Sequence, residues 1–543
     1  MKRVLVLGGY GGFGRGVSEG LLERGFEVVV AGRGLGEAER FCAGRPGLVP
    51  AAVDRDRDLA EALSWHSPWA VVDAAGPFQG LDYRVPQACI AVGAHYLDLA
   101  DAREFVAGIG ALDAAARVAG VAVISGASSV PALSGAVVRR LAESLDRVTA
   151  VEMSISASNR ASFGRSVMQA VLSGAGRPLR LWRSGHWTGV FGLSEARKER
   201  YALDGGPPVG PRIVSLVDVP DLDLLAERLP GRPAVVFRAG TELATGNLAL
   251  TAIGLLRRAG LLRKPQALAP WLAPIVRATA WLGSDRSAMA VTVHGLAGER
   301  RLMRRWTLIA ERGDGPKIPT LAAPLLAQAL AEGRLELGAG DAGQLLSLEV
   351  FEGAFAPLAV RHGEVEHEPP PPLYSRVLGE RFQALAPTLR RMHAPLRDGG
   401  AAGMSWVERG RQPLARLVAA LFRFPRAGEA VPVHVSFSEG PDGEVWTRDF
   451  DGRQFSSRLS QRGDLLVERF GALRFGFRLP ARDGGLEMVM ARWWLGPVPL
   501  PLALAPKSLA REWEAEGRFH FDVPISLPLV GLVVRYTGWL DPL

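Results

Sequence analysis

The sequence has 543 residues, a length that corresponds to about three domains at roughly 100–200 residues each. Hydrophobic residues make up 48% and charged residues 22%, close to globular averages, which excludes wholesale disorder, collagen and coiled coil. The net charge of +8 is small for this length, aromatic residues are only 7%, and no basic run is interleaved with aromatics, so nucleic acid is excluded as the main partner.

The two cysteines, Cys42 and Cys89, are too few for a disulfide framework, and no Cys/His spacing predicts a metal site. The chain begins without the apolar core and cleavage site of a signal peptide, so we expect a reducing cytoplasm. No apolar run reaches the roughly 20 residues that a membrane-spanning helix needs. Apolar stretches flanked by arginine, such as 267–283, leave peripheral membrane contact open.

Residues 1–125 alternate between strand and helix patterns. Short apolar runs predict six strands, at 3–7, 27–31, 48–53, 70–74, 95–99 and 121–125. Helical spacing predicts helices at 14–24, 85–92 and 111–119. Strands that are apolar throughout and alternate with helices predict an α/β fold with a doubly wound parallel sheet, covered on both faces.

Residues 126–365 mix the two types and predict an α+β domain on one mixed sheet. Helices are expected at 131–143 and 321–335, a strand at 147–156, and an antiparallel hairpin from 288–294 and 301–310. Four consecutive prolines then predict a stiff linker over 366–372.

Residues 373–543 predict a β-rich C-terminal domain. Two helical stretches, 373–392 and 413–424, precede closely spaced strands at 431–437, 444–450, 453–459, 464–470, 473–479, 486–494 and 517–523. Turn signals separate these strands, which favours an antiparallel barrel or a sandwich behind two helices.

One glycine motif carries the chemistry. It follows the first apolar strand, opens an amphipathic helix, and comprises Gly9, Tyr10, Gly11, Gly12, Phe13 and Gly14. In this Gly-x-Gly-x-x-Gly spacing the first glycine permits a tight turn, the second lets the backbone approach a pyrophosphate, and the third allows close helix–strand packing. The helix N-terminus then offers free N–H groups to the phosphates of a dinucleotide. The alternative is a glycine-rich turn without a ligand.

The end of the second strand distinguishes between the two nicotinamide cofactors. An Asp or Glu there usually holds the ribose hydroxyls of NAD, whereas Arg33 stands here and the first carboxylate is Glu37. A guanidinium pairs with a 2′-phosphate, so the sequence favours NADP over NAD. The alternative is that Arg33 is a solvated loop residue.

Further candidates follow the later strands, at the edge where a cofactor crevice is expected. Cofactor contacts are predicted for Asp54 and for the four residues after the fourth strand, Ala75, Gly76, Pro77 and Phe78. Weaker substrate contacts are predicted for Asp98, Asp101, Ser128 and Ser129. Alternatively, Asp54 lies in a surface loop and the two later aspartates cap a helix. No residue stands out as a catalytic acid or base.

These motifs, in this order, resemble the saccharopine dehydrogenase-like NADP-binding oxidoreductases. The resemblance covers about residues 1–350 and is strongest up to residue 135; Ala132 departs from it, because family members often have glycine there. It implies a Rossmann domain over 1–125, a substrate and dimerisation domain over 126–365, and reversible hydride transfer. It does not imply saccharopine as the substrate.

The C-terminal region resembles a bacterial domain of unknown function that is often fused behind such dehydrogenases. The matching segments are 373–379, 500–506, 517–523 and 527–540.

Two functions therefore stay open. The first is an NADP-dependent oxidoreductase that acts on an unidentified small-molecule or lipid-like substrate, as a homodimer or a monomer. The second is a catalytically silent NADP-binding sensor or scaffold whose C-terminal domain binds a partner or a membrane surface.

Overall fold

The computed structural model describes residues 1–160, 165–440 and 443–543, and its chain divides into two compact units. The first unit comprises Met1–Leu181, Thr188–Val293 and Met303–His367. The second comprises Trp182–Trp187, His294–Leu302 and Glu368–Leu543. The chain therefore passes between the units at five places and not only at the proline run.

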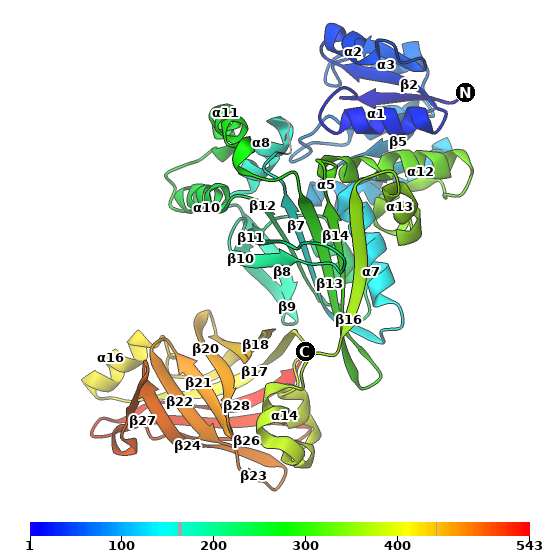
Figure 1. The fold of residues 1–543 in the computed structure, drawn as a ribbon. Helices are drawn as coiled ribbons and strands as arrows, with labels where there is room; N and C mark the ends of the chain where they lie inside the picture. Colours follow the sequence, from blue (N-terminus) through cyan, green and yellow to red (C-terminus); the bar gives the residue numbers. More distant parts are fainter. Residues whose placement is uncertain (161–164, 441–442) are drawn as a thin grey trace. The chain divides into compact units, whose positions relative to one another are not determined.

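The N-terminal part of the first unit is built on a seven-stranded parallel sheet, whose first strands along the chain are coloured blue in Figure 1. The strand order is β15-β6-β5-β4-β1-β2-β3. The first six strands along the chain are β1 (Arg3–Leu7), β2 (Glu27–Gly32), β3 (Leu48–Ala52), β4 (Ala70–Asp73), β5 (His95–Asp98) and β6 (Ala122–Ser125). All six were predicted, because each is rich in apolar residues; the sheet buries them almost completely except at β3, where Val49 and Ala52 are exposed.

Helices connect these strands. They are α1 (Gly14–Glu23), α2 (Leu35–Cys42), α3 (Leu59–His66), α4 (Arg84–Ala91), α5 (Arg103–Gly108) and α6 (Asp113–Ala119). Val17 and Leu21 of α1 are fully buried, as the helical spacing predicts. Helices α2, α3 and α5 are short and were not predicted.

The seventh strand comes from far along the chain. β15 (Gly338–Asp341) pairs in parallel with β6 and so completes the edge of the nucleotide-type sheet. Before it, α12 (Ala322–Ala331) packs on α1, where Pro324 lies against Gly20. The nucleotide-type fold is therefore discontinuous in sequence.

The rest of the first unit is a mixed seven-stranded sheet with the order β10-β11-β12-β7-β13-β14-β16. Its strands are β7 (Arg147–Ala157), β10 (Arg197–Tyr201), β11 (Val209–Leu216), β12 (Ala234–Thr241), β13 (Ser287–Ala297), β14 (Arg300–Ala310) and β16 (Val360–His367). The expected hairpin is confirmed as β13 and β14. Residues 366 and 367 of the expected linker belong to β16, which pairs with β14.

Helices accompany the mixed sheet. They are α7 (Ser134–Ala142), α8 (Arg165–Gly174), α9 (Asp221–Arg228), α10 (Ala244–Arg258), α11 (Ala269–Ala278) and α13 (Leu348–Phe355). Helices α8, α10 and α11 gather beside one end of the sheet (Figure 1), and their inner residues form an apolar cluster around Leu172 and Ile253. A separate two-stranded ribbon consists of β8 (Pro178–Arg183) and β9 (His186–Phe191).

The second unit is an antiparallel barrel with short helices. The helices are α14 (Leu373–Leu378), α15 (Pro387–Met392) and α16 (Pro413–Leu421). The strands are β17 (Asp398–Arg409), β18 (Gly428–Gly440), β19 (Gly443–Phe450), β20 (Arg453–Arg462), β21 (Leu465–Phe470), β22 (Leu473–Arg478), β23 (Ala481–Arg482), β24 (Gly485–Leu495), β25 (Val498–Leu500), β26 (Leu509–Ala515), β27 (Arg518–Leu527) and β28 (Gly531–Pro542).

Pairing between β22 and β24 closes the sheet, so the barrel alternative is confirmed over the sandwich. β17 and β28 pair with each other and were both missed by the sequence patterns. Among the described residues, no helix combines the length and the apolar character that crossing a membrane requires.

Candidate functional site

The glycine loop joins β1 to α1. Gly8 takes the left-handed conformation at φ 73°, and the Gly11 amide donates to the Gly8 carbonyl oxygen at 2.8 Å. The Gly9 amide donates to the Ala31 carbonyl oxygen at 3.0 Å, which ties the loop to β2. A Cβ on Gly14 would overlap the Gly8 carbonyl oxygen, so this position requires glycine.

Above the loop the space is open. A Cβ on Gly12 would meet no atom within 4 Å. α1 has no side-chain cap, and in the described chain the amides of Gly12 and Phe13 donate to no acceptor. Free amides at a helix N-terminus beside open space fit a pyrophosphate group. The loop therefore has both the room and the donors that a dinucleotide needs.

Tyr10 links the loop to the end of β2. The Gly34 amide donates to the Tyr10 hydroxyl at 2.8 Å, and the ring lies so close to Gly32 that a Cβ there would come within 2.6 Å of the hydroxyl. Arg33, between these two glycines, is exposed and has no partner within the described residues. Its guanidinium is therefore free to pair with a ligand phosphate.

Asp54 has a local role in the structure. Its carboxylate accepts from the Asp56 amide at 3.1 Å, at the turn that leads into α3. The neighbouring Arg55, which the sequence did not single out, donates to the buried carboxylate of Asp73 at 2.9 Å. A buried Asp at the end of an apolar strand needs hydrogen-bond donors or a cation, but the sequence does not say which residue supplies them. This pair bridges the ends of β3 and β4, two strands that β1 and β2 separate in the sheet.

The segment after β4 divides into two parts. Ala75 and Gly76 are half-buried and Pro77 is exposed, so this stretch of backbone is accessible. Phe78 is only 4% exposed and packs against Phe105, with 5.6 Å between the ring centroids. The cofactor contacts of Ala75, Gly76 and Pro77 therefore stay predictions, whereas the Phe78 ring belongs to the apolar core.

Asp98 lies fully buried at the end of β5. One of its oxygens accepts from the amides of Gly126 (2.8 Å) and Ala100 (2.9 Å) and from the Ser125 hydroxyl (3.0 Å), which ties β5 to β6. Burial raises the pKa of Asp98 to about 7 despite these donors. Its position fits a structural role, in which Asp98 holds the strand ends together, rather than a substrate contact.

The other weak substrate candidates are dispersed. Asp101 is exposed and accepts from the Gln79 amide nitrogen at 3.1 Å. Ser128 is half-buried and donates to the Pro319 carbonyl oxygen at 3.2 Å, and Ser129 is buried. Their roles in substrate binding stay predictions.

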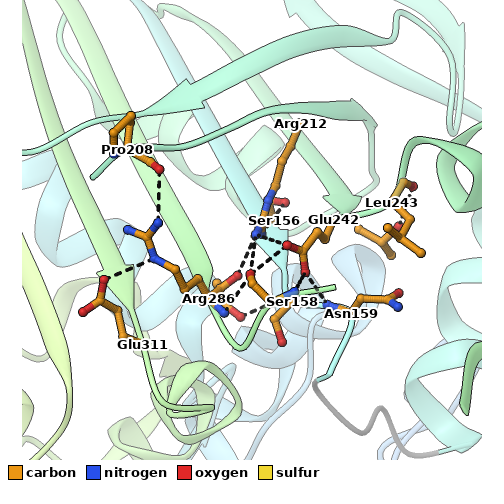
Figure 2. Close-up of polar contacts among 12 residues, drawn as sticks. Ser156, Ser158, Asn159, Pro208, Arg212, Glu242, Leu243, Arg286 and Glu311 are labelled. Carbon is orange, nitrogen blue, oxygen red and sulfur yellow. Dashed lines mark hydrogen bonds and ion pairs between the residues drawn. The ribbon is translucent and has the colours of Figure 1, made fainter. Parts of the chain in front are cut away.

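A second polar site lies in the mixed sheet and had no sequence motif. Figure 2 shows Arg212 of β11 beside Glu242, which directly follows β12, with 3.1 Å between guanidinium and carboxylate. The same carboxylate accepts from the Asn159 amide at 3.0 Å and from the Ser284 hydroxyl at 2.7 Å. Burial raises the pKa of Glu242, but these hydrogen bonds and the Arg212 charge outweigh it and hold the pKa below its ordinary value.

Arg286 extends this network through an ion pair with Glu311 at 3.2 Å and a hydrogen bond to the Pro208 carbonyl oxygen (Figure 2). Each arginine thus has a carboxylate partner, so the network holds strand ends together. The polar run 159–166 predicts a surface loop from the sequence, with anion binding as the alternative. Asn159 is fixed in the network, and 161–164 lie outside the described residues.

Comparisons with known proteins agree with this geometry at both ends of the chain. Residues 4–124 match the family model of the saccharopine dehydrogenase NADP binding domain. Residues 385–540 match a domain of unknown function, DUF4166. No curated protein matches the chain.

Solved structures were compared as well. The apo saccharopine dehydrogenase (L-Glu forming) of Saccharomyces cerevisiae aligns over 67% of this chain and 100% of its own, at 12% identity and a TM-score of 0.46. The 3-ketoacyl-(acyl-carrier-protein) reductase of Brucella melitensis, complexed with NADH, aligns over 23% of this chain and 73% of its own, at 18% identity and a TM-score of 0.20.

The sheet, the glycine loop and the N-terminal family match define an oxidoreductase with NADP as its cofactor. Its nucleotide domain is of the saccharopine dehydrogenase type, and this domain precedes a C-terminal DUF4166 domain.

Proposed function

We propose that the protein transfers hydride between NADPH and an apolar, lipid-like small molecule, in the cytoplasm at a membrane surface. The observation that carries the cofactor part is the open, donor-lined loop at Gly12. When bound, the nicotinamide supplies the hydride, and the protein supplies binding and orientation.

The roles of this chain's residues follow from their positions. The amides of Gly12 and Phe13, with the positive end of the α1 dipole, hold the pyrophosphate. Arg33 pairs with the 2′-phosphate, and the Tyr10–Gly34 hydrogen bond holds the two binding segments in register. The accessible backbone of Ala75 to Pro77 borders the nicotinamide half of the cofactor.

NADPH titration of two glycine variants tests this site. Gly12→Val places a side chain in space that the protein leaves empty, so the variant should fold yet lose NADPH affinity by at least about tenfold. Gly36→Val is the matched control, because Gly36 also has no neighbour within 4 Å but lies in α2. Unchanged affinity in Gly12→Val would remove the proposed cofactor site.

The lipid-like substrate is inferred from an apolar surface on α10, α11 and the residues around them. Trp271 (78% exposed), Trp281 (73%) and Ile275 (58%) project into solvent. The same stretch exposes Leu248, Leu255, Leu256, Leu261 and Leu282. So many exposed apolar side chains within one stretch of chain favour a membrane or protein interaction site.

Charge favours a membrane over a protein partner. Between Glu242 and Asp285 the chain has no acidic residue, whereas the basic ones are Arg257, Arg258, Arg263, Lys264 and Arg277. Exposed tryptophans beside basic side chains suit the interface of an anionic bilayer, where each basic residue contributes about 1 kcal/mol.

Co-sedimentation with phosphatidylserine-containing vesicles tests this surface. Trp271→Ala combined with Trp281→Ala should lower binding by about tenfold or more, and added salt should weaken the wild type. Trp65→Ala is the control, because Trp65 is 82% exposed but lies on α3. If the double variant binds vesicles like wild type, or instead converts a dimer to a monomer, the membrane assignment is wrong.

The silent-sensor alternative makes a different prediction. It requires NADPH binding with neither oxidation of NADPH by a lipid-like carbonyl compound nor reduction of NADP⁺ by a lipid-like alcohol. Turnover with one member of that class excludes it.

A further inference from the structure

The barrel of the second unit encloses a cavity of about 190 Å³. Ten strands form the closed ring, β17–β22, β24 and β26–β28, and their inward side chains line the space. Small barrels either fill their interior with side chains or leave room for one small ligand. An engineered cavity of about 150 Å³ holds benzene, so this one accepts a chain or ring system of roughly ten carbon atoms.

Most of the lining is apolar. Met488 and Met490 face inward from β24, while Val489 between them is 39% exposed, as the alternation of a strand requires. Phe519 and Phe521 of β27 contribute aromatic surface in the same way. This lining selects an apolar body.

One region of the lining is polar. The Arg448 guanidinium pairs with Glu468 at 3.3 Å, and Glu512 pairs with the fully buried His393 at 2.7 Å. Because each of these charges already has a partner and two of the groups are carboxylates, the cavity offers no net positive charge. A ligand with an anionic end would therefore meet repulsion and lose its hydration.

Two tyrosine hydroxyls remain available there. Tyr374 and Tyr536 line the cavity and are 1% and 6% exposed, yet neither hydroxyl has a hydrogen-bond partner among the described residues. Buried tyrosines usually find such a partner. The Tyr374 ring stacks on His393, with 3.8 Å between ring centroids, and so lies beside the His393–Glu512 pair. The Tyr536 ring packs against Phe455, over which the Arg448 guanidinium lies at 5.6 Å.

We propose that this barrel is a binding site for an uncharged molecule with an apolar body of about ten carbons and one hydroxyl or carbonyl end, which hydrogen-bonds to Tyr374 and Tyr536. The site is separate from the proposed hydride-transfer function and does not depend on it.

The first experiment uses the full chain, saturated with NADP so that the cofactor site is occupied. Naphthalene, a neutral fluorescent probe of ten carbons, should bind with a change in emission, and decanol should displace it at a concentration at least about tenfold lower than decanoate. Equal competition by decanoate would overturn the charge argument. Absence of probe binding, or failure of decanol to compete, would overturn the site.

Variants on the two faces of β24 locate the probe. Met488→Trp and Met490→Trp each fill the cavity and should weaken probe binding at least about tenfold, whereas Val489→Trp, on the outer face, should not. Binding unchanged in both inward variants would overturn the proposal.

Tyr536→Phe keeps the aromatic ring and removes only the hydroxyl. It therefore tests the site even if the tryptophan variants misfold. It should weaken decanol about three- to tenfold, the loss of one hydrogen bond, and leave the probe unaffected. A decanol affinity equal to wild type would show that this hydroxyl does not bind the polar end, which also overturns the proposal.

Discussion

Arg33 is an exposed guanidinium held between two glycines whose positions Tyr10 fixes. Arg33→Ala should lower NADPH affinity about 10- to 100-fold and leave NADH affinity unchanged, because charge-assisted phosphate pairing contributes about 1.5–3 kcal/mol. Fluorescence titration of both cofactors measures the effect. Arg40→Ala, an exposed arginine on α2, is the control. Wild-type protein that binds NADH as tightly as NADPH would contradict the assignment.

Asp98 makes the stability of the first unit depend on pH. Its pKa is about 7 in the folded chain and about 3.9 in an unfolded one. Between these values the folded chain keeps a proton that the unfolded chain has lost. The contribution of this group to stability therefore falls as pH rises from about 4 to about 7, and it is constant above that range.

The Asp98→Asn variant lacks this titration. Its melting temperature relative to wild type should rise as pH is raised from about 5 to about 8. Asp56→Asn, at an exposed position of the same unit, serves as the control and should show no such trend. A difference between Asp98→Asn and wild type that is independent of pH would mean that the buried carboxyl does not titrate in this window.

Some residues of the site could be predicted and others could not. The glycines and Arg33 can be predicted from the sequence because a local turn and a strand end fix their positions. Arg55 with Asp73, and Arg212 with Glu242, are pairs whose members lie 18 and 30 residues apart in the chain. Tertiary packing alone brings such pairs together, so no local pattern reveals them.

At the scale of elements, the contact between α1 and α12 offers a sharp test. A Cβ on Gly20 would lie 3.0 Å from the Pro324 ring, whereas Gly36 in α2 is open. Gly36→Leu should stabilise the protein by about 0.5–1 kcal/mol through helix propensity. Gly20→Leu should destabilise it by about 1–3 kcal/mol through overpacking, as measured by urea unfolding. If both variants gain stability, α12 does not pack on α1.

Two of the strands that escaped prediction, β15 and β17, are rich in glycine and alanine. β15 reads Gly-Ala-Gly-Asp, and β17 contains five glycines or alanines in succession after Asp398. β15 has none of the β-branched or aromatic residues that mark a strand, and β17 has them only at Trp406 and Val407, near its end. A Cβ on Gly403 of β17 would overlap the Trp539 carbonyl oxygen, so close strand packing requires glycine here. Because glycine is rare in strands, the same residue prevents recognition of the strand from the sequence.

At the scale of the whole molecule, the proline run does not alone separate the two units. Trp182–Trp187 and His294–Leu302 belong to the second unit, where Arg301 pairs with Glu439 at 2.7 Å and His434 contacts the Ser184 carbonyl oxygen at 2.9 Å. A protease site inserted at 369–372 should therefore yield two fragments that co-elute in size-exclusion chromatography.

Arg301→Ala should weaken that association by at least about tenfold, because it leaves the largely buried Glu439 carboxylate without its cation. Arg300→Ala, at the more exposed neighbouring ion pair with Glu368, is the matched control and should have a small effect. Fragments that separate in the wild-type sequence would show that the proline run is the main connection.

The late position of β15 also has a consequence in time. A ribosome adds about 5–20 residues per second, so roughly 10–40 s pass between the emergence of β6 and that of its neighbour at Gly338–Asp341. During that interval the newly made β6 presents an unpaired row of N–H and C=O groups, the kind of edge at which chains aggregate. The nascent protein is therefore a natural client for chaperones until about two-thirds of it has been translated, and codons that slow translation before residue 338 should lower its soluble yield.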